Sequence, residues 1–248
     1  MVWIYTAVYR QKSIDKRDYK LYIFSGFFLS LHFASFYGAV KFTSIANATL
    51  LGITAPMFTI LYERLFLKKT LKPLIFLGVL FALCGSLIIA SSGLLLKDGS
   101  LYGKLLGVLA AFSIAMVYIS ANKLRVNSNT ISYTRMLYTV AAIFLFLMSI
   151  VIGESIFAIN STDIVWLVSL GLVPTILGHS LFYYAIKYTS PTIIASVPLG
   201  EPIIASILAW IIFSENVPII TLVGGALILF GVYFIIANSS RAHLTDNC

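Results

Sequence analysis

Eight apolar stretches, each about 20 residues long, constrain the fold of this chain more than any other feature. A helix of that length crosses about 30 Å, which is the thickness of the hydrocarbon core of a bilayer. The stretches fall at residues 21–40, 45–66, 73–93, 101–121, 133–153, 163–186, 191–213 and 217–237. They predict eight full membrane spans.

The composition indicates that these segments are surrounded by lipid. Hydrophobic residues make up 60% of the chain and charged residues 10%, whereas soluble proteins carry about 25% charged residues. The stretches lack the alternation of apolar and polar residues that is typical of membrane barrel strands, and a helix satisfies its own backbone groups in lipid. We therefore expect an all-α fold, a polytopic membrane helix bundle.

Basic residues are concentrated in alternate connections between the stretches. One side of the predicted bundle receives the clusters at 10–20, 64–72 and 123–135, together with Lys187 and Arg241. The positive-inside rule places this side, and with it the C-terminus, in the cytoplasm. The formal net charge of +8 therefore reflects membrane topology, and we expect no nucleic-acid partner.

An internal repeat with an offset of 146 residues runs through the sequence. The segment FYGAVKFTS at 36–44 returns as FYYAIKYTS at 182–190. Five predicted spans separate Lys41 from its counterpart Lys187, and an odd number of spans puts the two lysines on opposite faces of the membrane. We therefore expect the repeats to be inverted, which is the geometry that secondary transporters use for alternating access.

The repeat also predicts that the first half is incomplete. If the second repeat covers 101–237, the residues that match 101–145 would lie before Met1. We therefore assign residues 1–93 to a first inverted repeat that lacks its first span and most of its second, 101–237 to a second repeat of five helices, and 238–248 to a cytoplasmic tail. A signal peptide is the alternative for the first residues, although their basic residues follow the apolar stretch instead of preceding it.

Short motifs occupy corresponding places in the two halves. The second half contains HSLFYYAIKYTSP at 179–191, LGEP at 199–202 and IFSE at 212–215, and the first half contains YGA at 37–39, AP at 55–56 and ERLFL at 63–67. Together these motifs resemble EamA-like permeases of the drug/metabolite transporter superfamily. The resemblance covers nearly the whole chain and implies ten helices in two inverted units of five. It does not specify a substrate, because that superfamily transports amino acids, sugars, nucleotide sugars, polyamines and drugs.

Glu201 is the leading candidate for a functional side chain, because it lies near the middle of the apolar stretch 191–213. An ionised side chain at such a position costs roughly 2.5–3.5 kcal/mol on insertion scales. The carboxyl group therefore either stays protonated or faces a hydrated cavity, and a group that alternates between these states is a proton-coupling site. The alternative is a neutral, structural Glu201 that bonds a carbonyl freed by Pro202.

Polar residues at helical spacing indicate a second part of the predicted substrate or proton pathway. Thr175, His179 and Tyr183 stand at i, i+4 and i+8, so they form one stripe on a helix. His179 titrates near neutral pH when unperturbed and is a candidate for relaying a proton. In the first half, His32 lies within one position of repeat equivalence to His179. An interhelical hydrogen bond is the alternative role for either histidine.

The stretch 45–66 carries polar residues on two faces, so we expect it to lie inside the bundle. Its Asn47 and Thr54 join the predicted pathway, as does Tyr37, which is the repeat counterpart of Tyr183.

Three prolines interrupt the repeat-related stretches 45–66 and 191–213. Pro56, Pro198 and Pro202 each remove a backbone donor, so they are expected to kink the helices and to expose carbonyl groups that a cavity could use. A bend that serves only packing is the alternative.

Four glycines and two glutamates of the two halves are expected to have structural roles. The glycines at positions 78 and 85, like those at 224 and 231, are seven residues apart and are expected to permit close contact between helices. Glu63 and Glu215 are expected to be charges at the ends of loops.

The predicted function is secondary transport of a small molecule across the cell membrane. We expect an exporter of a metabolite such as an amino acid or a drug-like compound, with the stretches 21–40, 45–66, 163–186 and 191–213 lining its cavity. Proton coupling stays open, and the alternatives are a passive facilitator or channel and an inactive or structural membrane subunit. The sequence lacks the Gly-x-Ser-Gly and His-Glu-x-x-His motifs of intramembrane enzymes, and we expect neither a cofactor nor a metal. The oligomeric state is not predicted.

Overall fold

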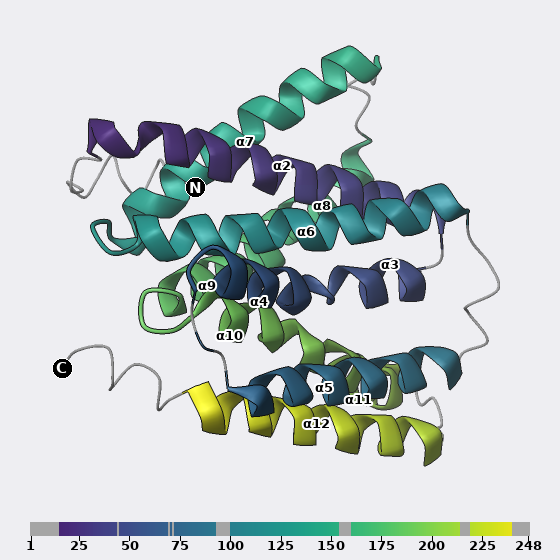
Figure 1. The fold of residues 1–248 in the computed structure, drawn as a ribbon. Helices are drawn as coiled ribbons and strands as arrows, with labels where there is room; N and C mark the ends of the chain where they lie inside the picture. Colours follow the sequence, from purple (N-terminus) through teal and green to yellow (C-terminus); the bar gives the residue numbers. More distant parts are fainter. Residues whose placement is uncertain are drawn as a thin grey trace. The chain divides into compact units, whose positions relative to one another are not determined.

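A computed structural model gives the structure of the chain and describes residues 15–43, 45–68, 70, 72–92, 100–153, 160–213 and 219–239. Within these residues every regular element is a helix (Figure 1). The elements are Lys16–Asp18 (η1), Tyr19–Phe42 (α2), Ile45–Gly52 (α3), Ala55–Leu65 (α4), Pro73–Ser92 (α5), Leu101–Leu124 (α6), Thr130–Ile152 (α7), Ser161–Leu170 (α8), Gly171–His179 (η2), Ser180–Ala185 (α9), Pro191–Ser196 (α10), Val197–Gly200 (η3), Glu201–Phe213 (α11) and Ile219–Ser239 (α12). The predicted all-α fold is confirmed for the described residues.

Six helical segments in the described part of the chain are long and apolar enough to cross a membrane. They are Lys16–Phe42, Leu101–Leu124, Thr130–Ile152, Thr162–Ala185, Pro191–Ile212 and Ile219–Asn238. The qualifying part of α5 is shorter, Pro73–Ile88, and the predicted stretch 45–66 is divided into α3 and α4. Each of the eight predicted stretches coincides with helical structure, and eight complete membrane crossings stay a prediction.

Capping residues explain where α7 and α10 begin and where α7 ends. The side-chain oxygen of Asn129 accepts a hydrogen bond from the backbone N–H of Ser132 at 2.7 Å. Gly153 follows α7 with a φ of 78°, a left-handed conformation that glycine adopts without steric cost. Ser190 caps α10 through its hydroxyl, and Pro191 occupies the first turn, where its missing N–H has no partner to lose.

Contacts divide the chain into two compact units, and each is described by itself. Unit 1 comprises residues 1–31 and 116–188, and unit 2 comprises residues 32–115 and 189–248. The divisions fall inside α2 and inside α6. This division differs from that into two repeats, whose boundaries stay a prediction.

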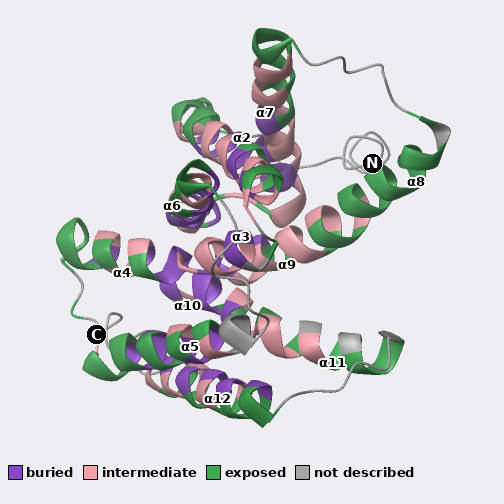
Figure 2. Cartoon of the chain, turned by 90° about the vertical axis from the view of Figure 1, so that its right-hand side faces the viewer, coloured by how far each residue is buried: buried purple, intermediate pink, exposed green. Residues whose placement is uncertain are grey.

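In unit 1, burial is concentrated where α7 meets the first part of α2 and the second part of α6 (Figure 2). The rings of Tyr22 on α2 and Tyr133 on α7 have centroids 5.7 Å apart, and those of Phe27 and Phe144 are 5.3 Å apart. By contrast, residues 162–170 of α8 are all exposed. Most of these exposed residues are apolar, which suits contact with lipid.

In unit 2, α5 and α12 lie side by side (Figure 1). Their contact is antiparallel, because Gly78 lies against Gly231 and Gly85 lies against Gly224. A Cβ atom at Gly78 would lie 2.6 Å from the Gly231 carbonyl oxygen, and a Cβ atom at Gly85 would lie 2.5 Å from the Gly224 carbonyl oxygen. Such an approach of two backbones requires glycine. The predicted role of these glycines in close helix contact is confirmed.

Both stretches that contain the predicted kink prolines are discontinuous. Residues 53–54 separate α3 from α4, and Pro56 lies in the first turn of α4. The turn η3, which contains Pro198, separates α10 from α11, and Pro202 lies in the first turn of α11. Proline is tolerated in a first turn, so these residues favour the start of a new helix over a kink inside one helix.

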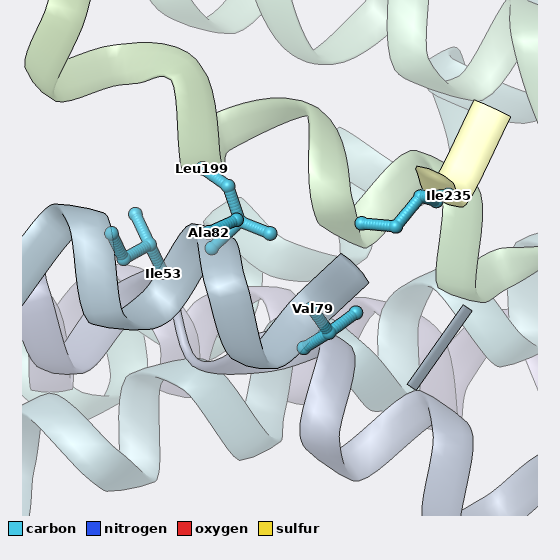
Figure 3. Packing of buried hydrophobic residues seen from close by; sticks show 5 residues of the cluster. All are labelled: Ile53, Val79, Ala82, Leu199 and Ile235. Carbon is cyan, nitrogen blue, oxygen red and sulfur yellow. The ribbon is translucent and has the colours of Figure 1, made fainter. Parts of the chain in front are cut away.

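The two helix breaks pack against the α5–α12 pair. Ile53 from the first break and Leu199 from the second lie with Val79, Ala82 and Ile235 in one buried cluster (Figure 3). In lipid, such packing stabilises through close van der Waals contact. The broken helices are therefore held against the same pair of continuous helices.

Candidate functional site

Unit 1 contains a cluster of aromatic side chains centred on Tyr183 of α9. The Tyr183 ring is 0% exposed, and its centroid lies 5.3 Å from that of Tyr133, 6.3 Å from those of Tyr118 and Tyr138, and 6.1 Å from that of His179. These separations are those of directly packed aromatic rings. Three helical segments, α6, α7 and η2–α9, therefore meet at one aromatic centre.

The hydroxyl group of Tyr183 has no hydrogen-bond partner among the described residues. A buried hydroxyl left in this way costs about 1–3 kcal/mol. The neighbouring Tyr133 hydroxyl lies 3.4 Å from the hydroxyl of Ser25. Tyr183 thus places a polar group at the centre of an apolar cluster, where water or a small polar molecule could bond it.

The predicted stripe of Thr175, His179 and Tyr183 lies partly in a π-helix. The predicted stretch 163–186 consists of α8, the π-helical segment η2 and α9. Pro174 lies inside η2 and lacks the N–H that would bond the Leu170 carbonyl. The Thr175 hydroxyl donates to that carbonyl instead, at 3.0 Å. Pro174 is a sequence signal for this irregularity.

Tyr138 of α7 ties this irregular segment to its neighbour. Its hydroxyl donates to the Thr175 carbonyl oxygen at 2.9 Å and lies 3.1 Å from the Ser180 hydroxyl. The ring of His179 stacks on that of Tyr183 with an interplanar angle of 25°. The structure therefore brings all three stripe residues to one region of unit 1, together with tyrosines that sequence reasoning did not single out.

Arg125 follows α6 and is a residue whose role the sequence did not reveal. It counted among the loop cations, yet it is only 2% exposed. Its guanidinium donates to the carbonyl oxygens of Tyr183 and Ser128 and to the hydroxyl of Thr130. Burial lowers the pKa of the Arg125 guanidinium, although arginine keeps its proton in proteins. Arg125 thus fixes the end of α9 against the connection between α6 and α7.

In unit 2, three of the predicted pathway residues have hydrogen bonds with other protein groups. Nδ1 of His32 lies 2.9 Å from the Ala110 carbonyl oxygen, which links α2 to α6. Asn47 is buried and donates to the Thr43 hydroxyl at 3.2 Å. The Thr54 hydroxyl donates to the carbonyl oxygen three residues earlier, at 2.6 Å. For His32, this contact is the interhelical bond that was the alternative to a functional role.

Tyr37 and Glu201 differ from these residues in being exposed. The Tyr37 side chain is 52% exposed, whereas its counterpart Tyr183 is fully buried. Glu201 is the first residue of α11 and is also exposed. Glu201 belongs to unit 2, whereas His179 and Tyr183 belong to unit 1. The roles assigned to Tyr37 and Glu201 stay predictions.

Glu63 is placed differently from its predicted position at a loop end. It lies in α4, is 0% exposed, and accepts a hydrogen bond at Oε2 from the Thr192 hydroxyl at 2.5 Å. The expectation of a solvated charge at Glu63 is wrong, because α10 covers this face of α4. Among the described residues, no three His, Cys, Asp or Glu side chains gather as a metal site would require.

Comparison with known proteins identifies the family. The model of the EamA-like transporter family matches residues 1–91 and 101–237. The chain belongs to the EamA-like transporter family. The resemblance inferred from the sequence motifs is thereby confirmed, and the family and the apolar helices together make this a multi-pass membrane protein.

Several proteins named as transporters or exporters are similar to this chain over most of its length. An uncharacterized transporter of Archaeoglobus fulgidus is 28% identical over 208 residues, which are 80% of this chain and 70% of that protein. One from Clostridium kluyveri is 24% identical over 211 residues, which are 83% of this chain and 68% of that protein. The pseudopaline exporter CntI of Pseudomonas aeruginosa is 23% identical over 219 residues, which are 88% of this chain and 75% of the exporter.

A solved crystal structure has the same fold as this EamA-family chain. It superposes with a TM-score of 0.76 at 14% sequence identity and covers 95% of this chain and 83% of its own. This likeness concerns the fold alone. The relatives and the family together support transport across a membrane as the general function.

Proposed function

We propose that this EamA-family protein is a secondary active transporter that exports a small metabolite by alternating access. The observation that carries the proposal is the repeat relation within unit 2, where helices 146 residues apart have matching patterns. Inverted repeats, which the sequence predicts here, allow two halves of a transporter to exchange shapes and so to expose a central site to either side of the membrane.

The first support is the position of the helix starts. Ala55 begins α4 and Glu201 begins α11, and these residues are 146 positions apart. Pro73 begins α5, and Ile219, the first described residue of α12, is again 146 positions later. The offset read from the sequence therefore relates α4 to α11, which both follow a helix break, and α5 to α12, which are both continuous.

The second support is the exchange of contacts between α5 and α12. By the same offset, Gly224 is the counterpart of Gly78, and Gly231 is the counterpart of Gly85. Gly78 contacts Gly231 and Gly85 contacts Gly224, so each glycine meets the counterpart of the other. A two-fold axis between the helices produces this reciprocal pattern. The axis is perpendicular to two antiparallel helices, so it lies in the membrane plane when both helices cross the membrane.

The discontinuous helices supply the means of binding a substrate. Broken helices at the repeat interface commonly form the substrate site of secondary transporters, because their breaks leave backbone groups free to bond a ligand. Export as the direction is supported by the relative that exports pseudopaline. The alternation of basic loops supports the cell membrane with a cytoplasmic C-terminus.

Transport by the purified protein in proteoliposomes tests the proposal. Vesicles are loaded in turn with amino acids, pseudopaline and drug-like compounds, and efflux is measured with and without an imposed proton gradient. We expect at least one compound to leave against its own concentration gradient when the proton gradient is present. Empty vesicles and vesicles with an unrelated membrane protein are the controls. Failure of all compounds to move would reject the proposal.

A passive facilitator is the second candidate function. It is distinguished in the same experiment, because it equilibrates the compound without ever concentrating it. Flux that only follows the concentration gradient, and that is unchanged by the proton gradient, would favour this alternative.

A further inference from the structure

Glu63 links two helices that belong to different predicted repeats. Its side chain is completely enclosed by protein, and its carboxylate bonds the hydroxyl of Thr192. The bond joins α4 of the first repeat to α10 of the second, and both helices lie in unit 2. Burial of a carboxyl group is costly unless the group is bonded. The stability of this carboxyl group therefore depends on the contact between α4 and α10.

The contact has a counterpart that is not formed. By the offset of 146 residues, α11 corresponds to α4 and α3 corresponds to α10. Within the described residues α4 packs on α10, whereas α3 does not pack against α11 in this way (Figure 2). Inverted repeats that exchange shapes close one such contact while they open the other. Of these two repeat-related contacts, the structure contains the one between α4 and α10.

The sequence makes the two alternatives chemically unequal. The positions that correspond to Glu63 and Thr192 are 209 and 46, and both hold alanine. The counterpart contact therefore has no carboxylate and no hydroxyl to form the equivalent hydrogen bond. Of these two pairs of repeat-related positions, the pair Glu63 and Thr192 alone can form a side-chain hydrogen bond.

We propose that Glu63 and Thr192 form the lock of the cytoplasmic gate. This inference rests on the proposed function, with its cytoplasmic side at the basic end of the bundle. Arg64 and Lys68 follow Glu63, and Lys187 precedes Thr192, so the lock lies at that end. The lock favours the state that is closed to the cytoplasm, and it breaks each time the transporter opens inward to receive its substrate.

Accessibility of a cysteine one turn beyond the lock tests the inference without any substrate. Ser196 is buried and lies four residues after Thr192 on α10, so Ser196→Cys is a reporter of similar size. Cys84 and Cys248 are first replaced by Ser. Inside-out vesicles are treated with a membrane-impermeant maleimide, and the labelling rate reports how often the cytoplasmic gate opens.

Removal of the lock is expected to speed labelling. Glu63→Ala and Thr192→Val each remove one partner of a hydrogen bond to a carboxyl group, and we expect a labelling rate about tenfold higher. Glu63→Gln and Thr192→Ser keep an acceptor or a hydroxyl, so both should remain near the original rate. Thr59→Val is the matched control, because Thr59 is equally buried in α4 but its hydroxyl bonds Pro56 of the same helix.

A second reporter separates gating from loss of structure. Ser86 is buried in α5, and its hydroxyl donates to the Ala82 carbonyl oxygen of the same helix. Faster labelling at Ser196→Cys with unchanged labelling at Ser86→Cys is the expected result. If the labelling rate does not increase at Ser196→Cys, or increases equally at both reporters, the proposed lock is wrong. Neither result would contradict the transport proposal. Faster labelling at Ser196→Cys in a protein that moves no compound would support the lock and reject the transport proposal.

Discussion

The close approach of α5 and α12 offers a direct test of the architecture of unit 2. Gly78→Ala would place a methyl group 2.6 Å from the Gly231 carbonyl oxygen and 2.9 Å from Cγ1 of Ile235. A carbon and a carbonyl oxygen normally stay about 3.3–3.6 Å apart. Because the obstacle is backbone, a rotamer change cannot relieve it, and α5 and α12 must separate.

The expected loss of stability follows from comparison with Gly225→Ala, a control on α12 whose new methyl group faces α11. In Gly225→Ala, the nearest atom to the new methyl group is Cγ1 of Ile203 at 3.8 Å, which is ordinary contact. Both substitutions gain about 1 kcal/mol from the higher helix propensity of alanine, so this term cancels. The remaining difference is the cost of overpacking, about 1–3 kcal/mol. We therefore expect Gly78→Ala to be less stable than Gly225→Ala by that amount.

Thermal unfolding of the purified variants in detergent measures the difference. By the scaling for chains of this size, Gly78→Ala should unfold roughly 2–12 °C below Gly225→Ala. Gly85→Ala should behave like Gly78→Ala, because its methyl group would lie 2.5 Å from the Gly224 carbonyl oxygen. If Gly78→Ala unfolds at the same temperature as Gly225→Ala, the close antiparallel contact of α5 and α12 is refuted.

Three further predictions concern Tyr183, Glu201 and the repeat. Tyr183→Phe removes a buried hydroxyl without a described partner, so it should stabilise the protein by about 1 kcal/mol in thermal unfolding. Tyr133→Phe is its control, and a Tyr183→Phe protein less stable than this control would contradict the reasoning. Glu201→Gln should abolish gradient-driven flux and spare counterflow, because only net transport requires a titrating group; unchanged concentrative transport between about pH 5 and 8 would reduce Glu201 to a structural residue. Lys41→Cys and Lys187→Cys should be labelled by an impermeant maleimide from opposite sides of the membrane, and labelling from the same side would end the inverted-repeat argument.

The candidate site was predictable where it follows from spacing along one helix. Thr175, His179 and Tyr183 do lie in one region, since residues four apart stay neighbours on a helix even where it becomes a π-helix. The tyrosines of α6 and α7 that surround Tyr183 were not predicted, because spacing within one helix contains no information about which other helix packs beside it.

Glu63 and Arg125 show the same limit for charged residues. Each stands beside a basic connection in the sequence, which suggests a solvated charge. Each is buried in the structure, because a partner from a later helix covers it: α10 covers Glu63, and α9 accepts a hydrogen bond from Arg125.

The sequence by itself determined the helical class, the membrane surroundings, the family and the repeat offset. The predicted stretches 73–93 and 101–121, for example, begin at the residues where α5 and α6 begin. These properties depend on length, polarity and spacing along a single segment, which lipid constrains strongly because a spanning helix must satisfy its own backbone. Only the tertiary structure decided which charges are enclosed and which helices pack against one another, since both depend on contacts between residues far apart in the chain, such as Glu63 and Thr192.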